Sequence, residues 1–332
     1  MAPNVRADSA KPGVTLDLGV RLGPVTPVWP LRGLSNAART TADTRDLRQN
    51  VRPSEGLALR WLGHEWNGLA KRDALGSVLT RPATDPQWNT EDFFATGQAD
   101  VAKLMTAAAR VAPTLATRRA LDFGCGVGRL TRALADYFDE VQGIDIAPSM
   151  IARARQQNGI PEGCHFEVNR RPHLQRFDDG LFDLVYSRLV LQHIPPRLVK
   201  RYIPELVRVL APGGLLVFQL PTEIDDSRRA FLEAPVQGGP LKHALPPELV
   251  HAYRQVKYVA LRTVMPHMDM FGMARSVVVE MVEGSGARLL AIEPDNAHGT
   301  RTPGFEYWAT KPQPTDRLGP RRPGVLMQGP AR

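Results

Sequence analysis

The chain has 332 residues, enough for one large domain or two small ones, and its 43 % hydrophobic and 23 % charged residues are ordinary for a globular protein. This composition excludes a collagen-like or wholly disordered chain, and two cysteines are too few for a disulfide scaffold. The net charge of +8 suggests nucleic acid, but residues 1–55 and 312–332 each carry a surplus of three positive charges. The body between these tails is nearly neutral, so we expect a small-molecule partner rather than nucleic acid.

The two ends of the chain differ from its body. Residues 1–55 are rich in Pro, Gly, Ala and Arg and predict a mobile basic arm, and residues 312–332 predict a disordered tail. No apolar run approaches the roughly 18 residues of a membrane span, and residues 1–30 lack the continuous apolar segment of a secretory leader. We therefore expect no membrane partner and a cytoplasmic location.

Residues 56–115 predict an N-terminal helical lid, including a helix from about Gln98 to Val111 that Pro113 ends. After this lid, short apolar runs alternate with helical segments, which is typical of a parallel sheet with helices on both faces. The expected strands are 119–124, 140–145, 164–168, 182–187, 215–220, 287–293 and 305–310. The expected helices are 127–137, 148–157, 196–210, 247–258 and 273–283. The segment 211–214, Ala-Pro-Gly-Gly, predicts a stop and a turn before the fifth strand.

The segment from Leu121 to Gly128 carries the chemistry. The first strand ends in the spacing Gly-x-Gly-x-Gly, from Gly124 to Gly128, and a helix is expected at once. Glycines there allow positive φ and a close approach of the backbone to a ligand, and the helix N-terminus offers free N–H groups. Asp145 ends the second strand, where a carboxylate can accept both hydroxyls of a ribose. A glycine loop alone is a weak signal, because dinucleotide-binding enzymes have a similar loop. The glycine loop and Asp145 together predict a nucleoside-containing ligand.

Four successive motifs resemble those of class I S-adenosylmethionine-dependent methyltransferases, particularly bacterial small-molecule enzymes of the ubiquinone-biosynthesis type. They are Asp122 to Gly128, Gly143 to Asp145, Phe182 to Val185 and Leu210 to Gly214. The resemblance covers roughly residues 90–311, a range that contains the expected methyltransferase domain of residues 116–311. It implies a Rossmann-like, seven-stranded and mostly parallel sheet of order 3-2-1-4-5-7-6, with strand 7 antiparallel and helices on both faces.

The resemblance also implies S-adenosylmethionine as cofactor and S-adenosylhomocysteine as product. Gly124 and Gly126 would hold its methionine part, and Asp122 would orient the amino group through water. Asp145 would bind the ribose hydroxyls. We allow for a homodimer, for which the sequence offers no specific signal.

Four further residues are assigned by the same resemblance. Ile146 and Met150 would lie against the adenine, and Asn169, where the family often has Asp, would meet the adenine amino group. Leu189 and the Ser187 region would close the wall near the reactive sulfur. Residues 221–270 are expected to form an insertion that binds the acceptor.

His193 has two interpretations. It follows the fourth strand at the edge of the sheet where ligands bind, so a neutral imidazole there could act as general base toward a substrate hydroxyl. Alternatively it packs or caps the turn before Pro195. His243, His251 and His267 lie in the insertion, and each alone is typical of a surface histidine.

No metal is expected. Acidic residues cluster after the fifth strand at Glu223, Asp225 and Asp226, but metal-dependent catechol-type methyltransferases place an acid directly after the fourth strand, where this chain has Ser187 and Arg188. The cluster is more typical of a solvated turn.

The sequence thus predicts methyl transfer to a small molecule, with a hydroxyl of a glycoside or secondary metabolite favoured by resemblance. N-methylation of a small molecule and a non-catalytic, S-adenosylmethionine-binding partner subunit remain alternatives. A nicotinamide-dependent oxidoreductase is a third. RNA-base methylation is disfavoured, because the run after the fourth strand reads Tyr-Ser-Arg-Leu rather than Asn/Asp-Pro-Pro-Tyr.

Overall fold

The structure is a computed structural model that describes residues 54–79, 88–222, 268–295 and 303–313. The chain divides into two units, Met1–Val51 and Arg52–Arg332, and every described residue belongs to the second. Most of the expected basic arm, the C-terminal tail and the acceptor insertion, with its helix at 247–258, lie outside the described residues.

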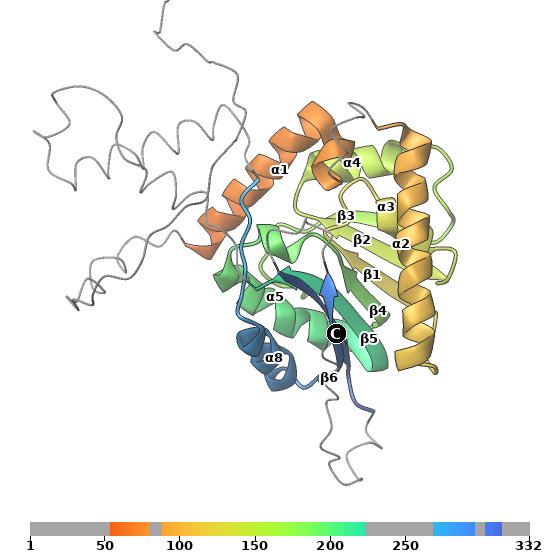
Figure 1. Cartoon of the computed structure of the whole chain (residues 1–332). Coiled ribbons are helices and arrows are strands. Elements are labelled where there is room, and N and C mark those ends of the chain that lie inside the picture. Colours follow the sequence, from red (N-terminus) through yellow and green to blue (C-terminus); the bar gives the residue numbers. More distant parts are fainter. Residues whose placement is uncertain (1–53, 80–87, 223–267, 296–302, 314–332) are drawn as a thin grey trace, which may run out of the picture. The chain divides into compact units, whose positions relative to one another are not determined.

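Seven strands form one sheet in the order β3-β2-β1-β4-β5-β7-β6 (Figure 1). The strands are β1 (Arg119–Phe123), β2 (Glu140–Asp145), β3 (Cys164–Val168), β4 (Phe182–Ser187), β5 (Leu210–Pro221), β6 (Arg288–Asp295) and β7 (Gly304–Thr310). The first five run parallel, and β7 pairs antiparallel with both β5 and β6. The predicted strand order and the antiparallel seventh strand are confirmed.

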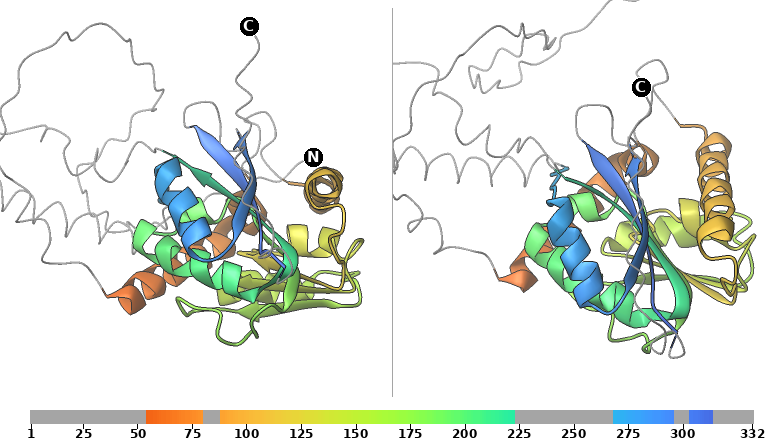
Figure 2. Two further views of the ribbon diagram at one scale, coloured as in Figure 1. Left: turned by 90° about the horizontal axis from the view of Figure 1, so that it is seen from below. Right: turned by 60° about the horizontal axis from the view of Figure 1, so that its bottom comes forward.

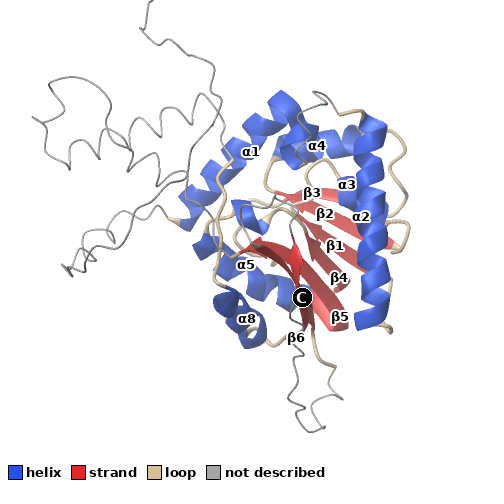
Figure 3. Cartoon of the chain, in the orientation of Figure 1, coloured by secondary structure: helices blue, strands red, loops and turns tan. Residues whose placement is uncertain are grey.

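Helices cover both faces of this sheet (Figure 3). They are α1 (Glu55–Val78), α2 (Thr90–Val111), α3 (Arg129–Leu134), α4 (Pro148–Gln156), the 3₁₀ turn η1 (Leu191–His193), α5 (Pro196–Val209) and α8 (Arg275–Gly284). Leu184 of β4 packs with α2 and α3, whereas the next residue, Val185, packs with α5 and α8. This alternation explains why β4 is apolar throughout: both of its faces are buried. Figure 2 shows α2 on one side of the strands and α5 and α8 on the other.

Three predicted helix starts were wrong, and one of them is α8, which begins at Arg275 rather than 273. Helix α2 begins at Thr90 rather than near Gln98, because the Asn89 side chain accepts a hydrogen bond from Glu91 N at 2.9 Å and caps the helix. Helix α3 begins at Arg129 rather than 127 and ends at Leu134 rather than 137. Its start is set by Gly128, whose left-handed backbone (φ +85°) cannot be part of a right-handed helix.

The start predicted for the fifth strand was also wrong. Strand β5 begins at Leu210 rather than 215, and the Ala-Pro-Gly-Gly segment lies within it. Pairing of β5 with β4 shifts register between Phe182 and Leu184, and Gly213 has a φ of +78°. Helix α5 ends at Val209, just before this segment, and the segment forms an irregularity in the strand instead of the separate turn that we predicted.

None of the described helices combines the length and the apolar character needed to cross a membrane.

Candidate functional site

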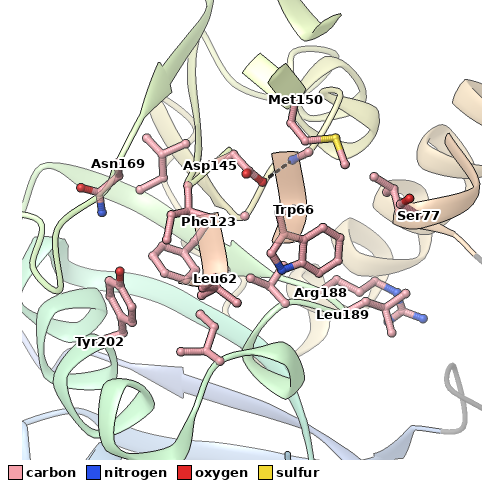
Figure 4. A pocket seen from close by; sticks show the side chains of 17 residues that line it. Leu62, Trp66, Ser77, Phe123, Asp145, Met150, Asn169, Arg188, Leu189 and Tyr202 are labelled. Atoms are coloured by element: carbon pink, nitrogen blue, oxygen red, sulfur yellow. Dashed lines mark hydrogen bonds between the residues drawn. The ribbon is translucent and has the colours of Figure 1, made fainter. Parts of the chain in front are cut away.

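A pocket lies at the carboxyl ends of β1, β2 and β4 (Figure 4). Seven of the eight residues predicted to bind the cofactor line it, namely Gly124, Gly126, Asp145, Ile146, Met150, Asn169 and Leu189. The eighth, Asp122, does not. The carboxyl edge of a parallel sheet is where such folds bind ligands, because the loops that connect the strands to the helices meet there.

The glycine loop after β1 forms the floor of this pocket. Its three glycines, Gly124, Gly126 and Gly128, all have positive φ. At Gly124 a Cβ atom would lie 2.3 Å from Cγ1 of Val190, so glycine is required there for space as well as for conformation. The loop is fixed to the neighbouring strand because Gly124 N and Cys125 N both donate to Ile144 O, at 2.8 and 3.0 Å.

Asp145 presents its carboxylate beside this loop. Its Oδ2 accepts from Gly126 N at 3.0 Å and its Oδ1 accepts from Ala147 N at 2.8 Å, the former drawn as a dashed line in Figure 4. Burial raises the pKa of Asp145 to about 6, against the lowering effect of these backbone N–H groups. Each carboxylate oxygen keeps a second lone pair, so Asp145 can still accept two hydroxyl groups from a ligand in the pocket.

Asp122 is buried behind the loop rather than in the pocket. Thr131 Oγ1, on α3, donates to Asp122 Oδ2 at 2.6 Å, and burial raises the pKa of Asp122 to about 6. The carboxylate therefore ties β1 to α3 directly. Its expected contact with the amino group of a cofactor stays a prediction and, from this position, requires an intermediary such as the water we anticipated.

Asn169 lies at the opposite side of the pocket from Ser77 and Arg188 in Figure 4. Its side-chain Nδ2 donates to Arg171 O at 3.3 Å, and its backbone N donates to Asp145 O at 2.8 Å. These bonds fix the loop after β3. Met150 and Ile146 add apolar surface to the pocket, and their contact with an adenine stays a prediction.

Helix α1 supplies a wall that sequence reasoning missed. Leu62, Trp66, Ser77 and Val78 all line the pocket. The helix is broken at Asp73 (φ −154°, ψ 90°), whose Oδ1 accepts from Gly76 N at 3.0 Å and so caps the last turn. The apolar composition of this segment predicts that it is buried. It does not predict that the segment covers the pocket, because that depends on tertiary packing.

Contacts with neighbouring elements hold α1 over the pocket. Asn67 Oδ1 accepts from Ser149 N at 3.0 Å and from Ser149 Oγ at 2.6 Å, which joins α1 to the first turn of α4. A Cβ atom on Gly126 would lie only 2.8 Å from a methyl group of Val78. The end of α1 therefore closes over the glycine loop.

His193 is buried and is not among the residues that line the pocket. Its Nδ1 lies 2.7 Å from Asp269 O, and its Nε2 lies 3.1 Å from Nε2 of Gln192. Because a carbonyl oxygen can only accept, Nδ1 carries the proton, and Nε2 then accepts from the amide of Gln192. The ring also packs edge-on against Trp66, with centroids 5.2 Å apart. This geometry favours the packing interpretation over the general base.

No group of three or more His, Cys, Asp or Glu side chains able to hold a metal ion occurs among the described residues. Glu223, Asp225, Asp226 and His267, which the sequence analysis considered, lie outside them.

Residues 121–218 match a protein family described as Methyltransferase domain. The chain is 39 % identical over 119 residues to 2-methyl-6-phytyl-1,4-hydroquinone methyltransferase of Synechocystis, covering 35 % of this chain and 36 % of that protein. It is 33 % identical over 140 residues to a trans-aconitate 2-methyltransferase of Methylobacterium radiotolerans, covering 40 % of this chain and 49 % of that protein. The chain thus spans less than half the length of these two relatives.

Among solved structures, a SAM-dependent methyltransferase of Leishmania major matches with a TM-score of 0.50 and 13 % identity, covering 75 % of this chain and 83 % of that one. At this identity the likeness shows the fold alone. The sheet order agrees with this fold, and the family match covers residues 121–218.

Proposed function

We propose that the chain transfers the methyl group of S-adenosylmethionine to a small-molecule acceptor. The observation that carries this proposal is the carboxylate of Asp145, which the glycine loop holds at the pocket by Gly126 N. This partly buried carboxylate has free acceptor capacity beside its two backbone N–H partners, and two adjacent ribose hydroxyls provide suitable donors. The apolar side chains of Ile146 and Met150 lie beside it and suit an adenine ring.

When bound, the cofactor supplies an electrophilic methyl carbon on a sulfonium that leaves as a neutral thioether. The residues of this chain bind and orient the reactants. Asp145 and the glycine loop hold the cofactor at the edge of the sheet. Trp66 and Val78 of α1 cover the pocket and exclude water from the reacting atoms.

We favour a hydroxyl of a glycoside or secondary metabolite as the acceptor. A relative named tocopherol O-methyltransferase from Arabidopsis thaliana, 36 % identical over 104 residues, supports an oxygen acceptor. The apolar pocket residues Leu62, Trp66 and Phe123 suit an acceptor with apolar surface. N-methylation of a small molecule remains the alternative, since an unprotonated amine needs alignment but no base.

Isothermal titration with S-adenosylmethionine, S-adenosylhomocysteine and NAD tests the cofactor first. We expect binding of the first two and none of NAD. Asp145→Ala should weaken S-adenosylhomocysteine binding at least about tenfold, because charge-assisted hydrogen bonds contribute about 1.5–3 kcal/mol each. Unchanged affinity in the Asp145→Ala protein, with its fold intact by circular dichroism, would remove the basis of the proposal.

An acceptor screen with a labelled methyl donor then tests catalysis. Transfer to a hydroxyl compound supports the favoured acceptor, and transfer to an amine supports the alternative. Tight cofactor binding without turnover on any acceptor would instead favour a non-catalytic partner subunit.

A further inference from the structure

The turn that follows β4 has an unusual backbone. Leu189 has a φ of +59°, and among the described residues no other non-glycine residue has a positive φ. A side chain with a Cβ is disfavoured in this left-handed region, so such a residue persists only where its surroundings fix it. Leu189 also lines the pocket, which means that the strained residue is part of the wall.

Contacts immediately before and after the turn hold its two ends. Ser187 Oγ donates to Phe123 O at 3.1 Å, and both groups are buried, so the end of β4 is tied to β1. On the other side, Val190 packs into the space above Gly124 that a Cβ would otherwise fill. These contacts fix Ser187 and Val190, which flank the turn, but they do not involve Arg188 or Leu189 themselves.

Arg188 provides a third attachment, and sequence reasoning gave it no role. Its guanidinium lies between carboxylates of three separate elements: Nη1 is 3.3 Å from Glu306 Oε1 on β7, Nη2 is 3.8 Å from Asp295 Oδ1 on β6, and Nε is 3.8 Å from Asp100 Oδ2 on α2. Asp100 is itself fixed by the buried Arg129 at 2.8 Å. The Arg188 side chain is 20 % exposed, so these charges are only partly screened by water.

We propose that Arg188 is a positioning residue, which holds the strained Leu189 turn in place and thereby shapes the pocket for the cofactor. The proposal rests on the proposed function, since it assumes that S-adenosylhomocysteine binds in this pocket. A planar guanidinium presents five N–H donors in a rigid fork, whereas a lysine ammonium is a compact charge on a flexible stem. Without this attachment, the turn is free to relax from the disfavoured backbone, and the wall at Leu189 moves.

The first test compares S-adenosylhomocysteine affinity by isothermal titration in the full chain. Arg188→Met should raise the dissociation constant about tenfold, and Arg188→Lys should give an intermediate rise of about threefold, because lysine keeps the charge without the planar fork. Arg208→Met is the matched control: Arg208 pairs with Glu205 at 2.9 Å and Asp179 at 2.6 Å, but it does not line the pocket. It should lower the melting temperature and leave the dissociation constant unchanged.

A second test separates positioning from direct contact with the ligand. In a Leu189→Gly background the left-handed backbone carries no penalty, so Arg188→Met should then weaken binding by less than about threefold relative to Leu189→Gly alone. An equal tenfold loss in both backgrounds would overturn the proposal and mark Arg188 as a direct ligand contact. Unchanged affinity of both Arg188 variants would overturn it as well.

Where Arg188→Met does not fold, the double variant Asp295→Asn and Glu306→Gln neutralises two of its three partners instead and leaves Asp100 unchanged. It should weaken S-adenosylhomocysteine binding in the same direction, and unchanged affinity there overturns the proposal. Failure of the unaltered chain to bind S-adenosylhomocysteine would contradict the proposed function itself, so the two failures are distinguishable.

Discussion

Asp145 combines burial with a pKa raised to about 6, and this gives cofactor binding a definite pH dependence. Ribose hydroxyls donate to the ionised carboxylate, so affinity is full above the pKa and falls as the pH drops through it. We expect S-adenosylhomocysteine to bind about tenfold more weakly at pH 5 than at pH 8, because each unit below the pKa reduces the ionised fraction about tenfold. Isothermal titration across this range measures the effect.

The matched variant for this prediction is Asp145→Asn, which is uncharged at every pH. Its affinity should be low and should vary little between pH 5 and pH 8. Asp122 also has a pKa raised to about 6 by burial, so any remaining pH dependence in Asp145→Asn reports on Asp122. A full pH dependence in that variant would contradict the role of Asp145.

His193 offers a second prediction at this scale. Both of its ring nitrogens have partners, and the ring supports Trp66, which lines the pocket. His193→Ala should therefore lower the melting temperature and reduce kcat by less than about tenfold, whereas loss of a positioned general base costs about 10²–10⁴. Once an acceptor is known, the pH profile of kcat decides. If His193→Ala loses a titration near the histidine pKa and its kcat falls about 10²-fold, the general-base interpretation is correct instead.

Individual site residues were predictable where one local feature determines them. The glycine loop and Asp145 could be placed from the sequence because strand, turn, helix and the next strand follow one another directly between Arg119 and Asp145. Arg188 could not, since its significance arises from carboxylates on α2, β6 and β7 that only the folded sheet brings together.

Helices α2 and α3 approach each other more closely than ordinary side chains allow. Gly97 makes this possible, because a Cβ there would lie 2.3 Å from Arg129 O. Gly97→Ala should destabilise the protein by about 1–3 kcal/mol, the usual range for an overpacked core, as measured by urea unfolding. Arg129 also reaches back to Thr96 Oγ1 at 3.1 Å and Asp100 at 2.8 Å, so displacement of α2 would disturb this buried pairing.

Gly56→Ala is the control for Gly97→Ala. Gly56 is an exposed residue of α1, and no atom lies within 4 Å of the position its Cβ would take. Gly56→Ala should change the free energy of unfolding by less than about 1 kcal/mol. The change should be stabilising, as expected when alanine replaces glycine in a helix. Equal destabilisation by both substitutions would show that the contact at Gly97 is not the cause.

The errors at element ends share a physical origin. Asn89 starts α2 eight residues before the expected position by capping it, and the left-handed Gly128 delays α3. Such ends depend on one side-chain bond or one backbone angle, whereas the existence of each element depends on many apolar residues. The strands were therefore predicted more securely than the boundaries of the helices.

At the scale of the whole molecule, the alternation of strands and helices predicted a parallel sheet from the sequence, while the strand order came from the resemblance of four motifs. The sheet confirms both. The wall formed by α1 was not predictable in the same way, because Trp66 and Val78 reach the pocket only after α1 packs on α4 and the helix breaks at Asp73.

Within the part of the chain that the structure describes, the residues that line the pocket fall between Leu62 and Tyr202, and the composition of the chain ends leads to a further prediction. Residues 1–50 and 315–332 carry no motif and are rich in proline, glycine and arginine, so we expect them to contribute little to the core. A protein spanning residues 51–314 should bind S-adenosylhomocysteine within about twofold of the full chain, a difference of less than about 0.5 kcal/mol. Its melting temperature should be nearly unchanged. Each end should also be removed singly, so that any effect can be assigned. If the shortened protein fails to fold or loses the ligand, the end responsible is part of the structure, and the domain limits proposed from composition are wrong.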